Sequence, residues 1–351
     1  MHRRLISQTV NVSKNNQAMP DLDVAIIGAG PAGLAASIEC KHRNLSHVVI
    51  EKGSIVESLR KFPTNMVYFT TPDLLEIGEL PLVSSREKPT RLEALKYYRR
   101  VAERYQLPLN LYEKVDAVER QNGLFRLHTT LKARQPGETR THRARKLIVA
   151  TGYYDNPNRL GVPGEDLPKV SHYYREAHPY YQMDVAVIGG ANSAAETALD
   201  LYRSGVNVTL IHWHAELSSH IKYWVRPDID NRIERGEIRA FFNTRVEEIL
   251  PDKLRLKGGD GRRFEIDNDF VLSLIGYHPD YRFLESMGIE IEPEQGRPVH
   301  DPETLESNVP GLYVAGGMVS GRETNKIFIE NGRFHGAKIV QHLAAHLKES
   351  R

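Results

Sequence analysis

The chain has 351 residues, of which 40% are hydrophobic and 26% are charged, and its formal net charge is +2. This length predicts about two domains, and the composition is typical of globular proteins. The small net charge gives no reason to expect nucleic acid as a partner, and no apolar run approaches the roughly 18 residues of a membrane span. Cys40 is the only cysteine, so the chain forms no internal disulfide. Residues 1–20 are polar without an apolar segment, so we expect a disordered tail and not a secretory signal; the alternative is that the natural chain starts at Met19, just before the first strand.

The first strong motif is Asp23–Gly33, an apolar stretch that runs into the pattern G-x-G-x-x-G. The apolar residues predict a buried strand, and Pro31 predicts the start of a helix. Gly28 permits a tight turn, Gly30 lets a pyrophosphate approach the backbone, and Gly33 lets the helix pack closely on the strand. The free N–H groups of the helix N-terminus would then face the phosphates.

An acidic residue follows at the distance expected for ribose recognition. Residues 47–51 form the second expected strand, and Glu51 at its end lies 23 residues after Gly28. A carboxylate at this position binds a ribose hydroxyl in dinucleotide-binding units. The alternative is an ordinary buried strand with a glycine-rich turn, but the strand, turn, helix and acid together favour a dinucleotide site.

The next part of the chain mixes irregular, helical and strand patterns. Residues 52–81 contain three prolines and are expected to be irregular chain around a cofactor. Residues 90–106 predict an amphipathic helix with Thr90 as its N-cap and Glu93 completing a capping box. The residues expected on or near its buried face are Leu92, Leu95, Tyr98 and Val101. Strands are expected at 109–111, 114–118, 125–129 and 145–152.

The first motif is repeated within the chain. Asp184–Ala194 echoes Asp23–Gly33, with its first glycine, Gly189, 161 residues after Gly28. Ala191 and Ala194 replace the second and third glycines, and such small residues still permit close approach. A helix over 193–204 and a strand over 206–211 follow. Two such units in one chain predict two nucleotides.

The residues after the second strand of this repeat bear on the choice of nicotinamide nucleotide. A carboxylate there would bind a ribose 2′-hydroxyl and repel a 2′-phosphate. The chain instead reads His212-Trp213-His214, with no acid before Glu216 and with Lys222 downstream. This pattern favours NADPH over NADH. The alternative is that the two histidines are plain surface residues.

With these motifs in place, the layout resembles the low-molecular-weight thioredoxin-reductase-like flavoproteins, and among them the YpdA-type bacillithiol-disulfide reductases. The similar segments are 150–157, 162–165 through 178–180, 189–194, 221–224 and 327–336. The resemblance implies an α/β fold of two Rossmann-like, ββα-type dinucleotide-binding domains. It places an FAD domain at 21–155 and 288–351, and an inserted NADPH domain at 156–287. It also implies a cytoplasmic homo-oligomer that acts in redox homeostasis without a metal.

The resemblance and the motifs together select the binding residues. Those expected for FAD are Gly28, Gly30, Pro31, Ala32, Gly33, Glu51, Lys52, Val115, Ala150, Thr151, Gly152, Gly316, Gly317, Lys326 and Ile327. Those expected for NADPH are Gly189, Gly190, Ala191, Asn192, Ser193, Ala194, His212, Trp213, His214, Lys222 and Gly276. Further polar groups expected near the flavin are Thr70, Thr71 and His335. A helix is expected over 324–347, with its N-terminal end towards the flavin.

The chain departs from its family at the redox cysteine. YpdA-type reductases commonly carry a cysteine just before the third glycine of the first motif, where this chain has Ala32. The dithiol positions of thioredoxin reductases fall at Tyr173 and Glu176. Cys40 lies seven residues past Gly33 and is expected to be a packing residue. No residue is therefore available for a flavin-to-thiolate relay.

The sequence is consistent with three functions. The first is an FAD-dependent oxidoreductase that passes electrons from NADPH to a low-molecular-weight disulfide, as a bacillithiol disulfide reductase without its own cysteine. The second is electron transfer to a protein acceptor, as in ferredoxin/flavodoxin–NADP reductases. The third, a nucleotide-sensing module without catalysis, is disfavoured by the two intact sites. A flavin monooxygenase is disfavoured because the linker signature F-x-G-x-x-x-H is absent.

Overall fold

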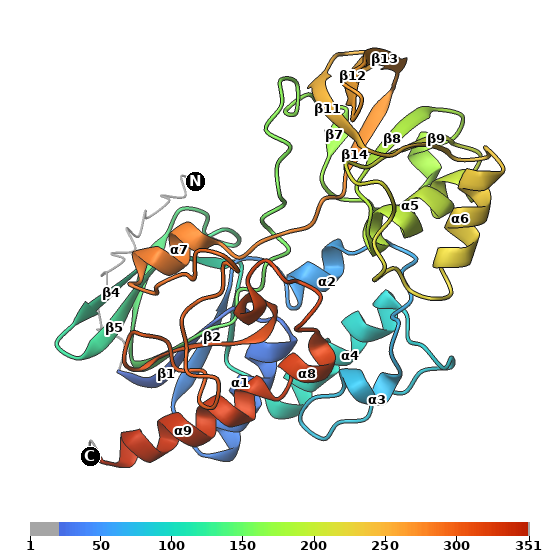
Figure 1. Cartoon of the computed structure of the whole chain (residues 1–351). Coiled ribbons are helices and arrows are strands. Elements are labelled where there is room, and N and C mark those ends of the chain that lie inside the picture. Colours follow the sequence, from blue (N-terminus) through green and yellow to red (C-terminus); the bar gives the residue numbers. More distant parts are fainter. Residues whose placement is uncertain (1–20, 350–351) are drawn as a thin grey trace, which may run out of the picture.

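A computed structural model describes residues 21–349, so the tail expected at 1–20 lies outside the described residues. Two α/β units are joined by two chain segments (Figure 1). The first unit takes its strands from both sides of the second unit in sequence, which confirms the expected class of two Rossmann-like units with the first one split. No described helix is long and apolar enough to cross a membrane.

The first unit is built on a seven-stranded sheet in the order β3-β2-β1-β6-β5-β4, with β15 also paired to β6. Its strands are β1 (Leu22–Ile27), β2 (His47–Glu51), β3 (Leu109–Leu111), β4 (Glu113–Gln121), β5 (Leu124–Leu131), β6 (Thr139–Val149) and β15 (Leu312–Val314). The pairs around β1 are parallel, whereas β4, β5 and β6 pair antiparallel. Residues 24–26 of β1 are fully buried, as expected for a central strand covered on both faces.

The helices of the first unit come from both parts of the chain. They are α1 (Pro31–His42), α2 (Glu57–Lys61), α3 (Pro72–Leu75), α4 (Arg91–Tyr105), α7 (Tyr281–Ser286), α8 (Ile329–Gly332) and α9 (His335–Glu349). Helix α9 lies along α1 (Figure 1). Gly336 permits this approach, because a Cβ atom there would lie 2.5 Å from the backbone nitrogen of Ala36.

Three expectations for local structure need correction. The expected helix over 324–347 begins only at Ile329 and is interrupted between α8 and α9, where Arg333 donates hydrogen bonds to the carbonyls of Asp73 and Glu76. The capping box of α4 is confirmed, but Leu92 is 52% exposed because Ala94 and Tyr97 share the buried face instead. Residues 52–81 are not wholly irregular, since they contain α2 and α3.

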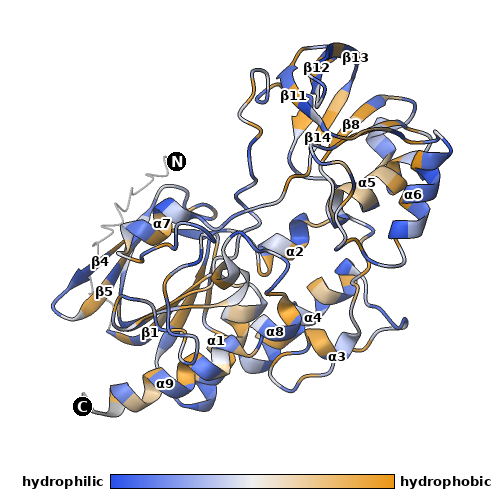
Figure 2. Ribbon diagram, viewed as in Figure 1, coloured by the Kyte–Doolittle hydropathy of each residue, from blue (hydrophilic) through white to orange (hydrophobic). Residues whose placement is uncertain are grey.

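The second unit is built on a five-stranded parallel sheet in the order β10-β9-β8-β14-β7. Its strands are β7 (Val170–Ser171), β8 (Asp184–Ile188), β9 (Asn207–Ile211), β10 (Arg239–Phe241) and β14 (Phe270–Ser273). An antiparallel sheet of β11 (Thr244–Ile249), β12 (Lys253–Gly258) and β13 (Arg263–Asp267) lies beside it. The helices are α5 (Asn192–Arg203) and α6 (Arg226–Glu234). In Figure 2, β14 is mostly hydrophobic and α6 mostly hydrophilic, as expected for a central strand and a surface helix.

The hydrophobic cores follow this division into units, with one difference from the expected boundary. Residues from α7, among them Leu284, pack in the core of the first unit, although the second unit was expected to extend to residue 287. The two segments that connect the units pair with each other: Asn158 donates to the carbonyl of Gly276, and His278 donates to that of Asn156. The connection between the units therefore consists of two segments of the chain that are hydrogen-bonded to each other.

Candidate functional site

A cavity of about 1890 Å³ lies between the two units and receives the glycine-rich turn of each. Residues of the turns, of the connecting segments and of the chain after β15 line it. From the first expected set, the residues that line it are Gly28, Gly30, Pro31, Ala32, Glu51, Lys52, Val115, Ala150, Thr151, Gly152, Gly316, Gly317 and Ile327. From the second set they are Gly189, Gly190, Ala191, Asn192, Ser193, His212, Trp213, His214, Lys222 and Gly276.

The turn between β1 and α1 has the geometry that its glycines predict. Gly28 has a φ of +106°, and a Cβ atom there would lie 2.5 Å from the carbonyl oxygen of Ala150. Gly30 is different, because a Cβ atom there would meet no atom within 4 Å. A Cβ atom at Gly33 would lie 2.0 Å from the carbonyl oxygen of Gly28. Gly28 and Gly33 are therefore required by the protein's own packing, whereas Gly30 opens onto the cavity.

Glu51 stands at the end of β2, where a ribose-binding carboxylate is expected. The side chain is 8% exposed, and its oxygens accept hydrogen bonds from the backbone N–H groups of Ala29 (2.9 Å) and Gly53 (2.8 Å). Burial raises the pKa of the Glu51 carboxyl above its ordinary value of 4.5, while these two hydrogen bonds oppose the rise. The two donors hold the carboxylate at the cavity wall.

The second turn repeats the geometry of the first. Gly189 has a φ of +143°, and a Cβ atom there would lie 2.5 Å from the carbonyl oxygen of Leu274. A Cβ atom at Gly28 would lie at the same distance from the carbonyl oxygen of Ala150. The N–H of Gly28 donates a hydrogen bond to the carbonyl of Ile50, the last apolar residue of β2. The N–H of Gly189 donates in the same way to the carbonyl of Ile211 in β9. This register places His212 at the position that Glu51 occupies in the first unit.

Three expected residues do not line the cavity. Gly33 and Ala194 each occupy the third-glycine position and pack behind the turn; Ala194 is fully buried. Lys326 is exposed outside the cavity. Of the further polar groups, Thr70, Thr71 and His335 also lie outside the lining. Burial lowers the pKa of His335 to about 4, and its Nδ1 accepts a hydrogen bond from the N–H of Gly316. His335 therefore fixes the Gly316 turn from behind.

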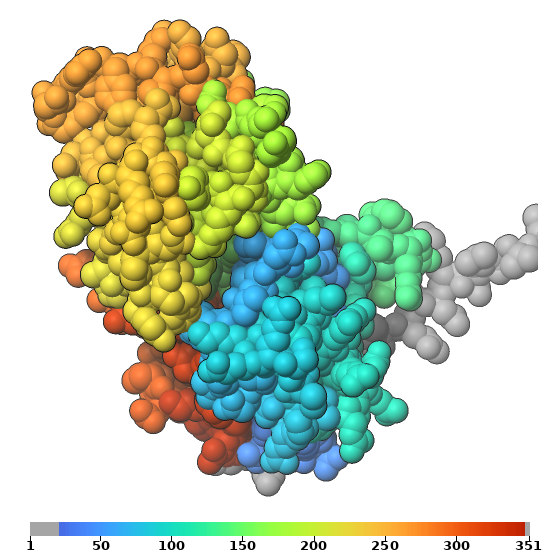
Figure 3. All heavy atoms as spheres, turned by 90° about the vertical axis from the view of Figure 1, so that its right-hand side faces the viewer, coloured from blue at the N-terminus to red at the C-terminus, as the bar shows by residue number. Residues whose placement is uncertain are grey.

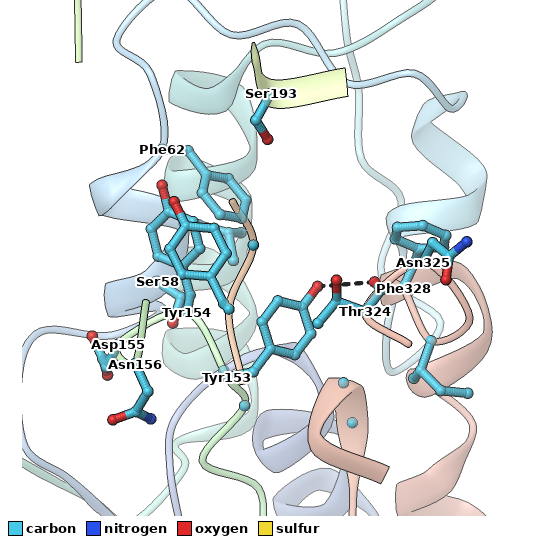
Figure 4. A pocket seen from close by; sticks show the side chains of 18 of the residues that line it. Ser58, Phe62, Tyr153, Tyr154, Asp155, Asn156, Ser193, Thr324, Asn325 and Phe328 are labelled. Atoms are coloured by element: carbon cyan, nitrogen blue, oxygen red, sulfur yellow. Dashed lines mark hydrogen bonds between the residues drawn. The ribbon is translucent and has the colours of Figure 1, made fainter. Parts of the chain in front are cut away.

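An aromatic cluster that the sequence did not predict lies at the cavity wall. The ring of Tyr154 lies 4.9 Å from that of Phe62 and 4.6 Å from that of Tyr277, and Tyr173 stacks on Tyr277 at 5.7 Å. Tyr153 points into the cavity, where its hydroxyl donates to the carbonyl of Thr324 (Figure 4). Ser193 reaches towards it from the second unit (Figure 4). The run Gly-Tyr-Tyr-Asp at 152–155 was the available signal.

The two units touch at one side of the cavity. The ammonium of Lys88, from the first unit, lies 4.0 Å from the ring centre of Trp224 in the second. Reciprocally, the ammonium of Lys222 lies 5.6 Å from the ring of Phe69. Figure 3 shows this face, with the yellow segment of the second unit resting on cyan residues of the first. Each cation–π contact at a partly exposed site contributes about 0.5–1 kcal/mol, so these two contacts are individually weak.

The three positions where relatives carry redox thiols, Ala32, Tyr173 and Glu176, lie in different surroundings. The methyl group of Ala32 lines the cavity beside Gly316, where a Cβ atom would lie 3.0 Å from it. Tyr173 belongs to the aromatic cluster, and Glu176 lies outside the cavity. Cys40 is fully buried, and burial raises the pKa of its thiol to about 12, so it does not form a thiolate at neutral pH. This confirms it as a packing residue.

The residues present fit a dinucleotide at each turn. A helix N-terminus without a side-chain cap opens each helix, at Gly30 for α1 and at Ala191 for α5. Both leave backbone N–H groups free for phosphate oxygens. The open space over Gly30 admits the phosphates, and Glu51 supplies an acceptor for hydroxyl groups. The donor set therefore suits two anionic nucleotides in one cavity.

Comparison with known proteins agrees with this geometry. Residues 25–316 match the family model described as "Pyridine nucleotide-disulphide oxidoreductase". Bacilliredoxin reductase Bdr of Bacillus subtilis is 43% identical over 91% of this chain and 96% of its own length. The solved structure of the bacillithiol disulfide reductase Bdr (YpdA) from Bacillus cereus is 41% identical and covers 93% of this chain and 100% of its own, with a TM-score of 0.91. A ferredoxin–NADP reductase of Lactococcus lactis is 27% identical over 85% of this chain and 86% of its own length.

Proposed function

Because the chain belongs to the pyridine nucleotide-disulphide oxidoreductase family, whose members use a flavin and a nicotinamide nucleotide, we propose that it takes hydride from NADPH through FAD and reduces a low-molecular-weight disulfide. The observation that carries this proposal is the repeat: two strand–turn–helix units open onto one cavity. The overall reaction balances as RSSR + NADPH + H⁺ giving 2 RSH + NADP⁺. Bacillithiol disulfide is the substrate proposed, since the solved relatives carry it in their names.

The first unit holds FAD in this proposal. The N-terminus of α1 and the open backbone at Gly30 receive the pyrophosphate, and Glu51 receives the ribose. FAD supplies the chemistry of accepting a hydride and passing its electrons on. The chain's part is to orient both nucleotides and to exclude water from the space between them.

The second unit holds NADPH. The N-terminus of α5 faces the pyrophosphate, and the place of the ribose carboxylate is taken by His212. A histidine neither repels a 2′-phosphate nor supplies the acceptor pair that favours a 2′-hydroxyl. Lys222 adds a positive charge at the cavity, although Glu196 pairs with it at 2.5 Å. The homo-oligomeric state and the cytoplasmic location implied by the family remain predictions.

A protein electron carrier is the second candidate acceptor. Ala32 favours it, because a chain without a thiol at the cavity cannot form a mixed disulfide with the substrate. The more distant likeness to a ferredoxin–NADP reductase points the same way. The disulfide is the first choice because the two solved relatives named for it are each 41% identical and cover 93% of this chain.

An acceptor panel separates the two candidates. NADPH oxidation by the purified flavoprotein is followed with bacillithiol disulfide, ferredoxin and flavodoxin, each over a range of concentrations. We expect turnover that saturates with the disulfide and a background rate with the two carriers. Turnover with the carriers alone would overturn the disulfide assignment while keeping the NADPH-to-flavin step.

A further inference from the structure

Most of the carboxyl groups that line the cavity already have a partner. Glu51 accepts from two backbone N–H groups, Asp200 accepts from a tyrosine hydroxyl, and Asp280 caps α7. Glu216 is exposed on the second unit. Those that pair with basic side chains are Glu57, Glu113, Asp116, Asp155 and Glu196. Among the described residues, this leaves Glu330 as the half-buried carboxyl of the cavity with no basic side chain paired to it and no helix end to cap.

Glu330 lies close to the first glycine-rich turn. It belongs to the first turn of α8, and a Cβ atom at Gly332 of the same helix would lie 3.5 Å from the Cα atom of Gly316. A Cβ atom at Gly316 would in turn lie 3.0 Å from the methyl group of Ala32. Phe328, just before α8, borders the same cavity (Figure 4). Helix α8 therefore brings its carboxyl to the wall of the cavity that includes Ala32.

A second polar group without a partner lies near Glu330. Tyr68 is 5% exposed and lines the cavity, and its hydroxyl is buried without a hydrogen-bond partner among the described residues. Burial, followed by the charge of Glu330, raises the pKa of this hydroxyl above its ordinary value of 10, so the two groups lie within electrostatic range. A buried hydroxyl of this kind is costly unless a ligand or a water molecule satisfies it. The two groups therefore form a polar site that is open to a ligand in the cavity.

We propose that Glu330 is the acid of the reaction, and that its carboxyl donates a proton to a sulfur of the disulfide as the S–S bond breaks. This inference rests on the proposed function and adds the residue that supplies the proton, because Ala32 brings no thiol to the cavity. Two electrons and one hydrogen from the reduced flavin convert one sulfur to a thiol, and the other sulfur takes the proton of Glu330. The products are 2 RSH, oxidised flavin and the Glu330 carboxylate, which regains a proton from water.

The surroundings of Glu330 favour its protonated form. Burial raises the pKa of the carboxyl above its ordinary value of 4.5, against its own N–H, the hydroxyl of Thr70 and the charge of Arg333. Arg333 forms no ion pair with it, since its guanidinium donates to two backbone carbonyls of the segment around α3. Residues 31–38 of α1 and the turn Gly316–Ser320 pack against α8 and carry no titratable group. The other titratable groups that face it are Asp73 of α3, Tyr68 and the fully buried Tyr98 of α4.

Rapid mixing isolates the step in which Glu330 acts. The holoenzyme is reduced anaerobically with dithionite, in the absence of nucleotide, and is mixed with bacillithiol disulfide between pH 5 and 9. Because the protonated carboxyl is the donor, the rate of flavin reoxidation should fall about tenfold per pH unit above the pKa of Glu330. Glu330→Gln should slow reoxidation about 10²-fold at low pH and remove this dependence. Reduction of the flavin by NADPH should keep its native rate in the variant.

Matched variants assign the proton to one side chain. Glu330→Asp keeps an acid on a shorter side chain, so it should restore the pH dependence at a lower rate. Glu216→Gln changes an exposed carboxyl of the cavity and should keep the native rate and pH dependence of reoxidation. Tyr68→Phe removes the other group without a partner and should also keep the pH dependence. A slope lost in Tyr68→Phe but kept in Glu330→Gln would assign the proton to Tyr68 and overturn the proposal.

Infrared spectroscopy of the holoenzyme supplies a readout that does not depend on turnover. The C=O band of a protonated carboxyl, taken as the difference between the native protein and Glu330→Gln, should titrate with a midpoint above pH 4.5. A midpoint at or below pH 4.5 would overturn the role of Glu330 while NADPH still reduces the flavin. Thermal unfolding of each variant with flavin bound shows whether the fold is retained. A reduced holoenzyme that bacillithiol disulfide reoxidises at no pH would overturn the proposed function itself, and the role of Glu330 with it.

Discussion

Gly28 and Gly30 of the first turn have different roles: Gly28 is required by the packing of the fold, whereas Gly30 is expected to leave space for the cofactor. Gly28→Ala places a Cβ atom 2.5 Å from the carbonyl oxygen of Ala150 at a φ of +106°. Backbone strain of this kind costs of order 1–3 kcal/mol, and the overlap adds a similar amount. We expect a loss of about 3 kcal/mol in unfolding free energy, which lowers the melting temperature by roughly 6–12 °C.

Gly30→Ala is the matched control, because the added Cβ atom meets nothing within 4 Å and the backbone there is extended, with φ −75° and ψ 176°. The stability of the flavin-free protein should change by less than about 0.5 kcal/mol. The new methyl group projects into the cavity, so flavin retention should fall. Both variants are assayed by thermal unfolding of the flavin-free protein and by the flavin-to-protein absorbance ratio. Full flavin retention in Gly30→Ala would refute the placement of the pyrophosphate at this turn.

The remaining predictions concern the missing thiol, a helix cap and acid stability. Ala32→Cys should raise the rate of disulfide reduction with bacillithiol disulfide, and an unchanged rate would show that the absent cysteine is not limiting. Thr90→Ala removes the hydroxyl that accepts from the N–H of Glu93, and it should lower the unfolding free energy in urea by about 1 kcal/mol without changing kcat. Burial opposes ionisation of Glu113, but hydrogen bonds led by that of His142 (2.6 Å) lower the pKa of its carboxyl below 4.5. The ionised Glu113 carboxylate therefore stabilises the fold fully above pH 4.5, and this stabilisation is lost as pH falls through its folded-state pKa. Urea unfolding midpoints measured between pH 3 and 6 should fall accordingly for the native chain, and this contribution should be absent in Glu113→Gln.

The strand–turn–helix units could be predicted because local pattern and tertiary role coincide there. The second strand was predicted at 47–51 and is observed at His47–Glu51, since Val48, Val49 and Ile50 are apolar and buried and Glu51 ends the strand at the cavity. The capping box of α4 could also be predicted, because it involves only Thr90 and Glu93, which are three residues apart. The match between His212 and Glu51 was predictable from spacing, because each lies 23 residues after the first glycine of its unit, and the strand pairing confirms it.

The features that were missed depend on contacts between distant parts of the chain. Tyr154 and Tyr277 meet only because the two connecting segments pair with each other between the units. The break between α8 and α9 depends on Arg333, which reaches carbonyls more than 250 residues earlier. Leu92 has the helical spacing of a core residue but faces outwards, because helix periodicity does not say which of two adjacent stripes is covered.

Anaerobic titration of the purified protein with NADPH tests the central claim, that one cavity brings a flavin and a nicotinamide nucleotide together. The protein should carry bound flavin, and its visible absorbance should bleach with about one equivalent of NADPH, because a hydride carries two electrons. The absorbance should return when the proposed disulfide is added, because the disulfide reoxidises the flavin. A protein that binds FAD yet stays yellow with excess NADPH would contradict the account, as would a protein that binds no flavin at all.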